Sequence, residues 1–183
     1  MLDFFVMPKS YIKNVYDLDV QRIVKEGYRL LICDIDNTLV AFHEEKPTEQ
    51  AQQFLDECKA AGLSVVICSN NVMERVKPFA DAGGCDCVWF FCKPFPWNYI
   101  KLRRKYKFKK KEVLCVGDQL LTDVVGANSM GFHSVFCDPL HDFDSSHTKF
   151  SRFLERYVLK WLTYRKKWKK GEYYGYQMQR VRH

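Results

Sequence analysis

Two aspartates two positions apart, Asp34 and Asp36, follow an apolar stretch of this 183-residue chain. Alternate residues of an extended chain point to the same side, so both carboxylates can face one reaction centre. Covalent hydrolysis of a phosphate ester needs such a pair, one group as nucleophile and the other as proton shuttle. Paired acids at a strand end are also common on solvated loops, so the pair alone decides nothing.

Further polar groups follow other apolar stretches. Ser69-Asn70-Asn71 offers a hydroxyl and backbone N–H groups that could bind a phosphoryl oxygen, although the same three residues could form an ordinary turn. Lys93 could offset the charge on phosphoryl oxygens, or could be a solvated lysine that opens a loop.

Asp118 follows the stretch that ends in Gly117, and Asp123 comes five positions later. Mg²⁺ takes oxygen ligands, commonly one or two carboxylates, so Asp118 could complete a magnesium site with Asp34. Asp123, in the first turn of the next predicted helix, could hold Lys93 or a metal-bound water.

The elements that must position these groups alternate strictly along the chain. The sequence predicts strands over 29–34, 64–68, 88–91, 113–116 and 134–137, and helices over 48–61, 72–81, 97–106 and 121–130. Thr48 is a predicted N-cap, and Gly62 and Gly131 are predicted helix ends. This alternation predicts a three-layer α/β fold with a mostly parallel sheet, buried on both faces. Ligands bind at the carboxyl ends of such strands, where the polar groups above should meet.

In this order, Asp34-x-Asp36-x-Thr38, Ser69, Lys93 and Gly117-Asp118-x₄-Asp123 resemble the four motifs of the haloacid dehalogenase (HAD) phosphatases, which have a Rossmann-like core. The resemblance implies that Asp34 is the nucleophile and forms an aspartyl-phosphate. It implies that Asp36 protonates the leaving oxygen and later activates water. An aspartate at this second position is typical of a phosphatase rather than a dehalogenase or phosphonatase.

The resemblance also implies a set of binding residues. Mg²⁺ would be held by the side chains of Asp34 and Asp118 and by the backbone carbonyl of Asp36. Ser69 and Lys93 would bind the phosphoryl oxygens, and Asp123 would hold Lys93 or a metal-bound water in place. We also count Asn37, Thr38 and Asn70 among the candidate phosphate-binding residues.

The spacing of the motifs leaves no room for a cap domain. The 11 residues from Leu39 to Glu49 and the 23 residues between Ser69 and Lys93 are too few for one. A capless site is open to solvent, and its substrate should be large or surface-bound.

Residues 5–160 are most similar to the YqeG-type phosphatases of subclass IIIA, which are related to mitochondrial phosphatidylglycerophosphate phosphatase. The motifs that carry this similarity begin at Pro8, Asp34, Ser69 and Gly117. It implies that the substrate is phosphatidylglycerophosphate, whose headgroup stays on a membrane, and that the product is phosphatidylglycerol.

Charge divides the chain near residue 149. Residues 149–183 hold 11 Lys and Arg against two Glu, whereas residues 1–148 hold 18 against 20 acids. We therefore expect a capless phosphatase core over 1–148 and a basic, aromatic-rich C-terminal helix and tail over 149–183. An excess of this sign indicates an anionic partner, either a lipid surface or nucleic acid.

The aromatic residues of 149–168, Trp168 included, recur at helical spacing. Such an amphipathic helix could cover the sheet, or residues 149–170 could lie on an anionic membrane. Nucleic acid is less favoured because no motif for reading bases is present. Tyr173, Tyr174 and Tyr176 are expected in a mobile end.

Eight cysteines, four of them in apolar runs, and the lack of a secretory signal favour a cytoplasmic protein with reduced thiols. It would be peripheral at the inner face of the membrane if residues 149–170 bind lipid. The histidines are scattered and receive no role. Two alternatives to the lipid phosphatase stay open. One is a phosphatase of another bulky or soluble phosphate, such as a nucleotide or sugar phosphate. The other is an RNA- or ribosome-associated module with weak hydrolysis.

Overall fold

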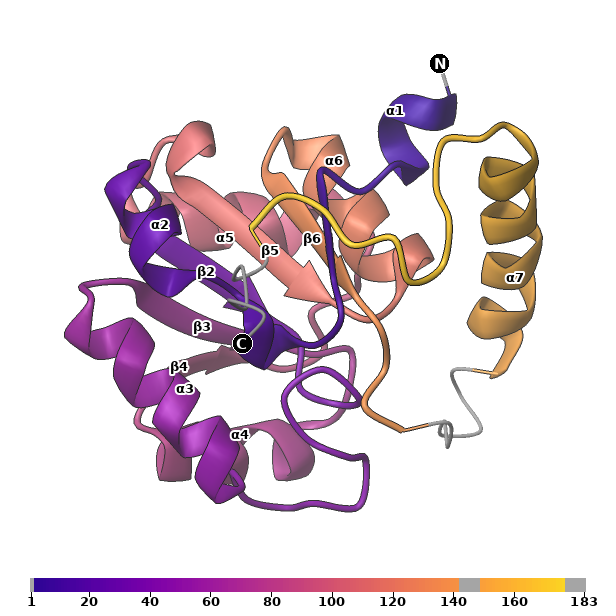
Figure 1. Ribbon diagram of the computed structural model, residues 1–183. Helices are drawn as coiled ribbons and strands as arrows, with labels where there is room; N and C mark the ends of the chain where they lie inside the picture. Colours follow the sequence, from indigo (N-terminus) through magenta and orange to yellow (C-terminus); the bar gives the residue numbers. More distant parts are fainter. Residues whose placement is uncertain (1, 142–148, 177–183) are drawn as a thin grey trace, which may run out of the picture.

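A computed structural model describes residues 2–141 and 149–176, and shows one parallel sheet (Figure 1). Its strands lie in the order β1-β6-β5-β2-β3-β4. They are β1 (Ser10–Ile12), β2 (Leu30–Cys33), β3 (Ser64–Cys68), β4 (Asp86–Val88), β5 (Val113–Gly117) and β6 (His133–Cys137). Every pair of neighbours is parallel, which confirms the expected sheet, and β1 is an additional strand that the sequence pattern does not predict.

Helices cover both faces of this sheet. They are α1 (Leu2–Val6), α2 (Val20–Lys25), α3 (Glu49–Ala60), α4 (Met73–Gly83), α5 (Pro96–Tyr106), α6 (Val125–Met130) and α7 (Lys149–Tyr164), with short helical turns η1 (Val15–Asp17), η2 (Lys110–Glu112) and η3 (Leu120–Val124). Apolar residues of α2, α3 and α4 pack on one face, against Leu31 and Cys33 of β2. Those of α5 and α6 pack on the other face, against Leu30 and Ile32. The three-layer α/β fold is therefore confirmed (Figure 1).

The local signals place most helix ends well. The Thr48 side chain accepts a hydrogen bond from the backbone N–H of Ala51 and so caps α3, as expected. Gly131 ends α6 with a φ of +73°, in the left-handed region where glycine carries no Cβ penalty.

Two predicted elements differ in the structure. The strand expected over 88–91 is instead β4 at Asp86–Val88, because Phe90 has a φ of +44° and its N–H bonds to the Asn71 carbonyl at 3.0 Å. The helix expected over 121–130 begins with the π-helical turn η3, and its α-helical part is α6.

The C-terminal segment corrects a third expectation. Helix α7 ends at Tyr164 rather than continuing to Trp168, and residues 165–176, here called the C-terminal strap, run back along the sheet edge. Tyr174 pairs with Tyr11 of β1 through two backbone hydrogen bonds of 2.8 and 3.0 Å. Trp168 is 7% exposed and packs with Tyr11 and Phe136. Tyr173, Tyr174 and Tyr176 are thus part of the packed structure, and the expectation of a mobile end there is wrong. Residues 177–183 of the expected tail, and 142–148 of the expected core, lie outside the described residues.

Candidate active site

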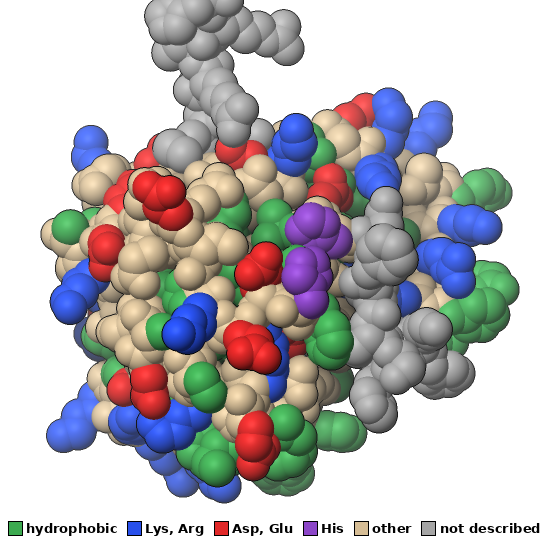
Figure 2. Space-filling model, turned by 90° about the horizontal axis from the view of Figure 1, so that it is seen from below, with side chains coloured by type: hydrophobic (Ala, Val, Ile, Leu, Met, Phe, Trp, Pro, Cys, Tyr) green, Lys and Arg blue, Asp and Glu red, His purple; other side chains and the backbone are tan. Residues whose placement is uncertain are grey.

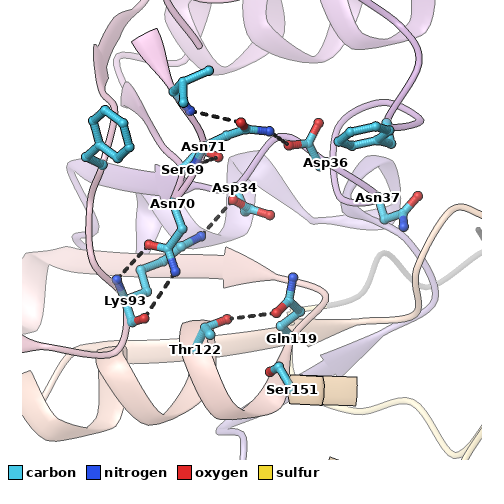
Figure 3. Close-up of a pocket in the computed structure, with 13 residues that line it drawn as sticks. Asp34, Asp36, Asn37, Ser69, Asn70, Asn71, Lys93, Gln119, Thr122 and Ser151 are labelled. Carbon is cyan, nitrogen blue, oxygen red and sulfur yellow. Dashed lines mark hydrogen bonds and ion pairs between the residues drawn. The ribbon is translucent and has the colours of Figure 1, made fainter. Parts of the chain in front are cut away.

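The polar groups that follow β2, β3, β4 and β5 meet at one cavity of roughly 510 Å³. Its walls are formed by Asp34, Asp36, Asn37, Phe42, Ser69, Asn70, Asn71, Val72, Phe90, Lys93, Gln119, Thr122 and Ser151. Figure 3 shows Asp34 at its centre, with Lys93 on one side and Asp36 on the other. This is the edge of the sheet where the sequence predicts the site.

Asp34, Lys93 and Asp123 form a buried ionic triangle, of which Asp34 and Lys93 line the cavity. The Lys93 Nζ donates hydrogen bonds of 2.7 Å to an oxygen of Asp34 and to an oxygen of Asp123. Burial lowers the pKa of Lys93, but the two carboxylates outweigh it and raise that pKa above its usual range. Lys93 therefore stays charged beside the group that would attack phosphorus.

Asp118 adds a third buried carboxylate close to Asp34 and Asp123. It accepts a 3.0 Å hydrogen bond from the Thr38 hydroxyl and forms an ion pair with Arg152. Burial raises the pKa of Asp118 to about 6, with Arg152 opposing and Asp123 adding to the shift. The site thus gathers more buried negative charge than Lys93 alone compensates.

The acids fit a divalent cation. Carboxylate oxygens of Asp34, Asp118 and Asp123 lie within 4.8 Å of one another, and all three residues are buried. Burial raises the pKa of Asp34 to about 8, with Lys93 opposing and the other acids adding to the shift. A cation with oxygen preference would favour the ionised form of Asp34 that a nucleophile needs.

Asp36 is held in place by a residue of the loop after β3 and by a residue of α4. Its carboxylate accepts hydrogen bonds from Arg75, at 3.0 and 2.7 Å, and from the Asn71 amide at 3.2 Å. It remains part of the cavity wall. The arrangement fixes the candidate proton shuttle beside Asp34 without burying it completely.

The other predicted binding residues divide into two groups. Ser69 and Asn37 line the cavity, as a phosphate binder must. Thr38 is fully buried, lies outside the cavity wall and holds Asp118 instead. Asn70 lines the cavity, but its amide bonds to the backbone N–H and carbonyl of Lys93, at 2.7 and 3.1 Å (Figure 3). Thr38 and Asn70 therefore position other site residues.

Gly117 lets β5 approach Asp123. A Cβ at Gly117 would lie 2.2 Å from the Asp123 carboxyl carbon, a distance that no packing arrangement tolerates. The glycine before Asp118 is therefore required so that both acids fit side by side at the end of β5.

Sequence reasoning gave no role to three residues that hold the site. Arg75 lies in the motif after Ser69, and its pairing with Asp36 is visible only in three dimensions. Arg152 of α7 also donates to the Asp118 carbonyl at 2.6 Å, and to Glu155 at 3.1 Å. Glu155 in turn accepts a 2.7 Å hydrogen bond from the Leu120 N–H. The one sequence signal for this contact is that Glu155 is the single acid in the helix; the structure shows that it is buried.

The cavity lies open between these loops. Residues 39–48 form the connection from Asp36 to α3, and residues 70–92 hold only α4, β4 and their loops. In these two described stretches no cap domain is inserted, which agrees with the motif spacing.

Comparison with known proteins matches this geometry to a family. Residues 9–131 match the model of the haloacid dehalogenase-like hydrolases. The chain is 33% identical over 159 residues to "Probable phosphatase YqeG" of Bacillus subtilis, a match that covers 87% of this chain and 92% of that protein. It is 23% identical over 145 residues to "Phosphatidylglycerophosphate phosphatase 1, chloroplastic/mitochondrial" of Arabidopsis thaliana, covering 74% of this chain and 42% of that longer protein.

A solved structure of an uncharacterized protein from Listeria monocytogenes serotype 4b shares the fold, with a TM-score of 0.51 and 18% identity over 63% of this chain and 85% of that one. Family model, relative and site geometry agree: the chain belongs to the haloacid dehalogenase-like hydrolases, as a phosphatase similar to the YqeG type.

Proposed function

We propose that this phosphatase is magnesium-dependent and removes the terminal phosphate of phosphatidylglycerophosphate through an aspartyl-phosphate at Asp34. The observation that carries the chemistry is the buried triangle of Asp34, Lys93 and Asp123 beside Asp118. It combines a nucleophile, a fixed cation for phosphoryl oxygens and a set of acids that fits Mg²⁺.

In the first step a carboxylate oxygen of Asp34 bonds to phosphorus, and the bond from phosphorus to the leaving oxygen breaks. Asp36, at the cavity wall, gives its proton to that leaving oxygen. In the second step Asp36 takes a proton from water, whose oxygen attacks phosphorus and releases inorganic phosphate from Asp34. Ser69 and Lys93, which line the cavity, would hold the phosphoryl oxygens throughout.

Mg²⁺, held by the Asp34 and Asp118 side chains and the Asp36 backbone carbonyl, would offset the negative charges of the nucleophile and the phosphoryl group. Asp123 would keep Lys93 in place, as its 2.7 Å contact indicates.

The lipid substrate is supported by the open cavity and by the Arabidopsis relative whose name specifies phosphatidylglycerophosphate. A headgroup that remains in a membrane can reach a site without a cap more easily than one closed behind a lid. A nucleotide or sugar phosphate would also fit a cavity of roughly 510 Å³, so the test includes both kinds of substrate.

Attachment to an anionic membrane is proposed for α7. Among the described residues, no helix is long and apolar enough to cross a bilayer. Phe153, Leu154 and Tyr157 are exposed on α7 together with Arg156 and Lys160, a mixture suited to a peripheral contact at the inner face of the membrane of a cytoplasmic protein. Hydrophobic and basic side chains are visible at the right of Figure 2, on the side where α7 lies. Trp168, which we expected to join this contact, is buried in the strap.

The test offers phosphatidylglycerophosphate in mixed micelles, and a panel of nucleotide and sugar phosphates, to the protein with Mg²⁺ or with chelator. We expect phosphate release from the lipid, dependence on Mg²⁺, and a loss of roughly 10³-fold or more in Asp34→Asn. Asp56→Asn, which removes an exposed acid of α3, is the matched control and should keep full activity.

Full activity in Asp34→Asn would contradict the assignment of the nucleophile. Much faster turnover of a soluble phosphate than of the lipid would contradict the substrate and leave the chemistry intact. Binding of RNA with negligible hydrolysis of every substrate would favour the binding-module alternative.

A further inference from the structure

Large exposed apolar side chains lie at the catalytic cavity and on the chain segments that adjoin its lining residues. Three of them, Phe42, Val72 and Phe90, line the cavity, and each is at least 40% exposed. The group that we call the apolar rim consists of Phe42, Val72, Met73, Phe90, Phe95 and Trp97. Single exposed apolar residues are ordinary, whereas a cluster around a functional opening indicates an interaction surface.

Hydrogen bonds to backbone groups tie the segments of the rim together. The Phe90 N–H bonds to the Asn71 carbonyl at 3.0 Å, which joins the loop after β4 to the loop that carries Val72 and leads into α4. The Asn98 amide donates to the Phe90 and Phe91 carbonyls at 3.3 and 2.8 Å, which joins that loop to the first turn of α5. The rim is therefore presented on fixed backbone, and binding a partner would cost little ordering of the chain.

The first residues of α5 carry the most exposed part of the rim. Phe95 is 61% exposed and Trp97 is 67% exposed. Phe95 is held by a 2.9 Å hydrogen bond from its N–H to the Cys92 carbonyl. Aromatic rings of this kind sit well at the headgroup level of a bilayer.

Cations continue the same surface. Lys101 and Arg104 follow Trp97 at four and seven positions, so the three side chains share one face of α5, opposite the buried Tyr99 and Leu102. Within the described part of the chain, neither Lys101 nor Arg104 forms an ion pair. In Figure 2, hydrophobic side chains gather along the lower edge of the molecule, with Lys and Arg side chains beside them.

We propose that the apolar rim and the cationic face of α5 dock the enzyme on an anionic phospholipid bilayer, with the mouth of the cavity turned toward the membrane. The aromatic side chains would enter the headgroup region while Lys101 and Arg104 contact lipid phosphates. The inference rests on the proposed lipid substrate, and it adds the surface by which that substrate is reached. A headgroup phosphate then enters the cavity without leaving the bilayer.

The experiment measures co-sedimentation of the full chain with sucrose-loaded vesicles of phosphatidylcholine containing about one third phosphatidylglycerol, chosen for its negative charge. The rim variant is the double substitution Phe95→Ser and Trp97→Ser, since neither residue lines the cavity. We expect its partition onto vesicles to fall by roughly 10-fold or more, because two exposed aromatic side chains leave the interface. Turnover of phosphatidylglycerophosphate in vesicles should fall with it, and turnover of soluble p-nitrophenyl phosphate should not change.

The matched control is Phe4→Ser with Phe5→Ser in α1, which packs against α6 and does not line the cavity. This control should bind vesicles as the wild type does. Vesicle binding by the rim variant equal to that of the wild type would overturn the inference, whatever the lipid turnover. Stronger rim-dependent binding to a single-stranded oligoribonucleotide than to vesicles would overturn it as well. Rim-dependent vesicle binding without any lipid hydrolysis by the wild type would refute the proposed substrate and support the docking surface.

Discussion

The catalytic end of the sheet and the C-terminal segment are built in different ways. At the catalytic end each polar group follows its own strand, so the sheet itself brings Asp34, Lys93 and Asp118 together. The C-terminal segment has no such frame. Its position depends on contacts with other elements, some of them more than 100 positions away, such as the pairing of Tyr174 with Tyr11.

The two regions meet where Arg152 of α7 pairs with Asp118 of the site and Glu155 accepts a hydrogen bond from the Leu120 N–H. The strap, which follows α7, packs Trp168 and Tyr174 on the rings of Tyr11 and Phe136, and its Lys167 pairs with Asp3. The catalytic end is thus a cluster of buried charges, whereas the strap combines aromatic packing with an ion pair of partly exposed groups. Substitutions in the two regions should therefore affect different properties of the enzyme.

Substitution of the buried lysine should have the largest effect, on activity. In Lys93→Met the nucleophile loses the cation that is 2.7 Å from it, and the phosphoryl oxygens lose their charge partner. We expect kcat to fall by about 10²- to 10³-fold with Mg²⁺ present. Lys77→Met, which removes an exposed lysine of α4 paired with Asp81, should leave kcat unchanged. A loss of less than about threefold in Lys93→Met would show that Lys93 does not act on the phosphoryl group.

Removal of the Arg152–Asp118 ion pair should lower the free energy of unfolding, and by less when Mg²⁺ is present. Arg152→Gln leaves the fully buried Asp118 without its cation, at a cost of about 3 kcal/mol in urea unfolding with chelator. Mg²⁺ would then supply the missing positive charge, so it should stabilise the variant more than the wild type. Arg156→Gln, on the same helix but exposed, should behave as the wild type does. An equal loss with and without Mg²⁺ would mean that Arg152 and the metal do not share Asp118.

The same contrast explains how far the sequence could predict the molecule. The motif residues Asp34, Ser69, Lys93 and Asp118 lie at predictable places because strand ends are local features and parallel strands align them. Thr38 and Asn70 fall in the same motifs, yet their hydrogen bonds show positioning roles, because the type of a residue does not determine where its side chain points.

Long-range contacts account for what the sequence pattern does not predict. Strand β1 has three residues, too short for a periodic pattern, and its partner β6 is more than 120 positions away. Trp168 continues the helical spacing of Trp161, but packing against Tyr11 decides its place, and Lys166 turns the chain with a φ of +53°. In the sequence Arg152 cannot be distinguished from the other basic residues of the C-terminal segment; only the structure shows its ion pair with Asp118.

The smallest of the three predicted effects is on the pH dependence of stability, through a histidine that contacts the strap. His133 of β6, one of the histidines given no role from the sequence, bonds to the Ser10 and Tyr28 hydroxyls at 2.8 and 3.0 Å and packs on Tyr176 of the strap. Burial lowers its pKa to about 4, Lys9 adds to the shift, and Glu26 opposes it. A histidine with a lowered folded-state pKa stabilises the fold above its unfolded value of 6.5, and this stability is lost as the pH falls toward 4.

His133→Gln keeps a hydrogen-bonding side chain that does not titrate. We expect its unfolding free energy, measured in urea without metal, to fall less steeply than that of the wild type between pH 6.5 and 4. The difference should reach roughly 2 kcal/mol at the acid end, less than the full linkage value because the ring is partly exposed. His43→Gln, at an exposed position, should retain the wild-type slope. Parallel pH profiles for His133→Gln and the wild type would show that protonation of His133 does not contribute to the loss of stability in acid.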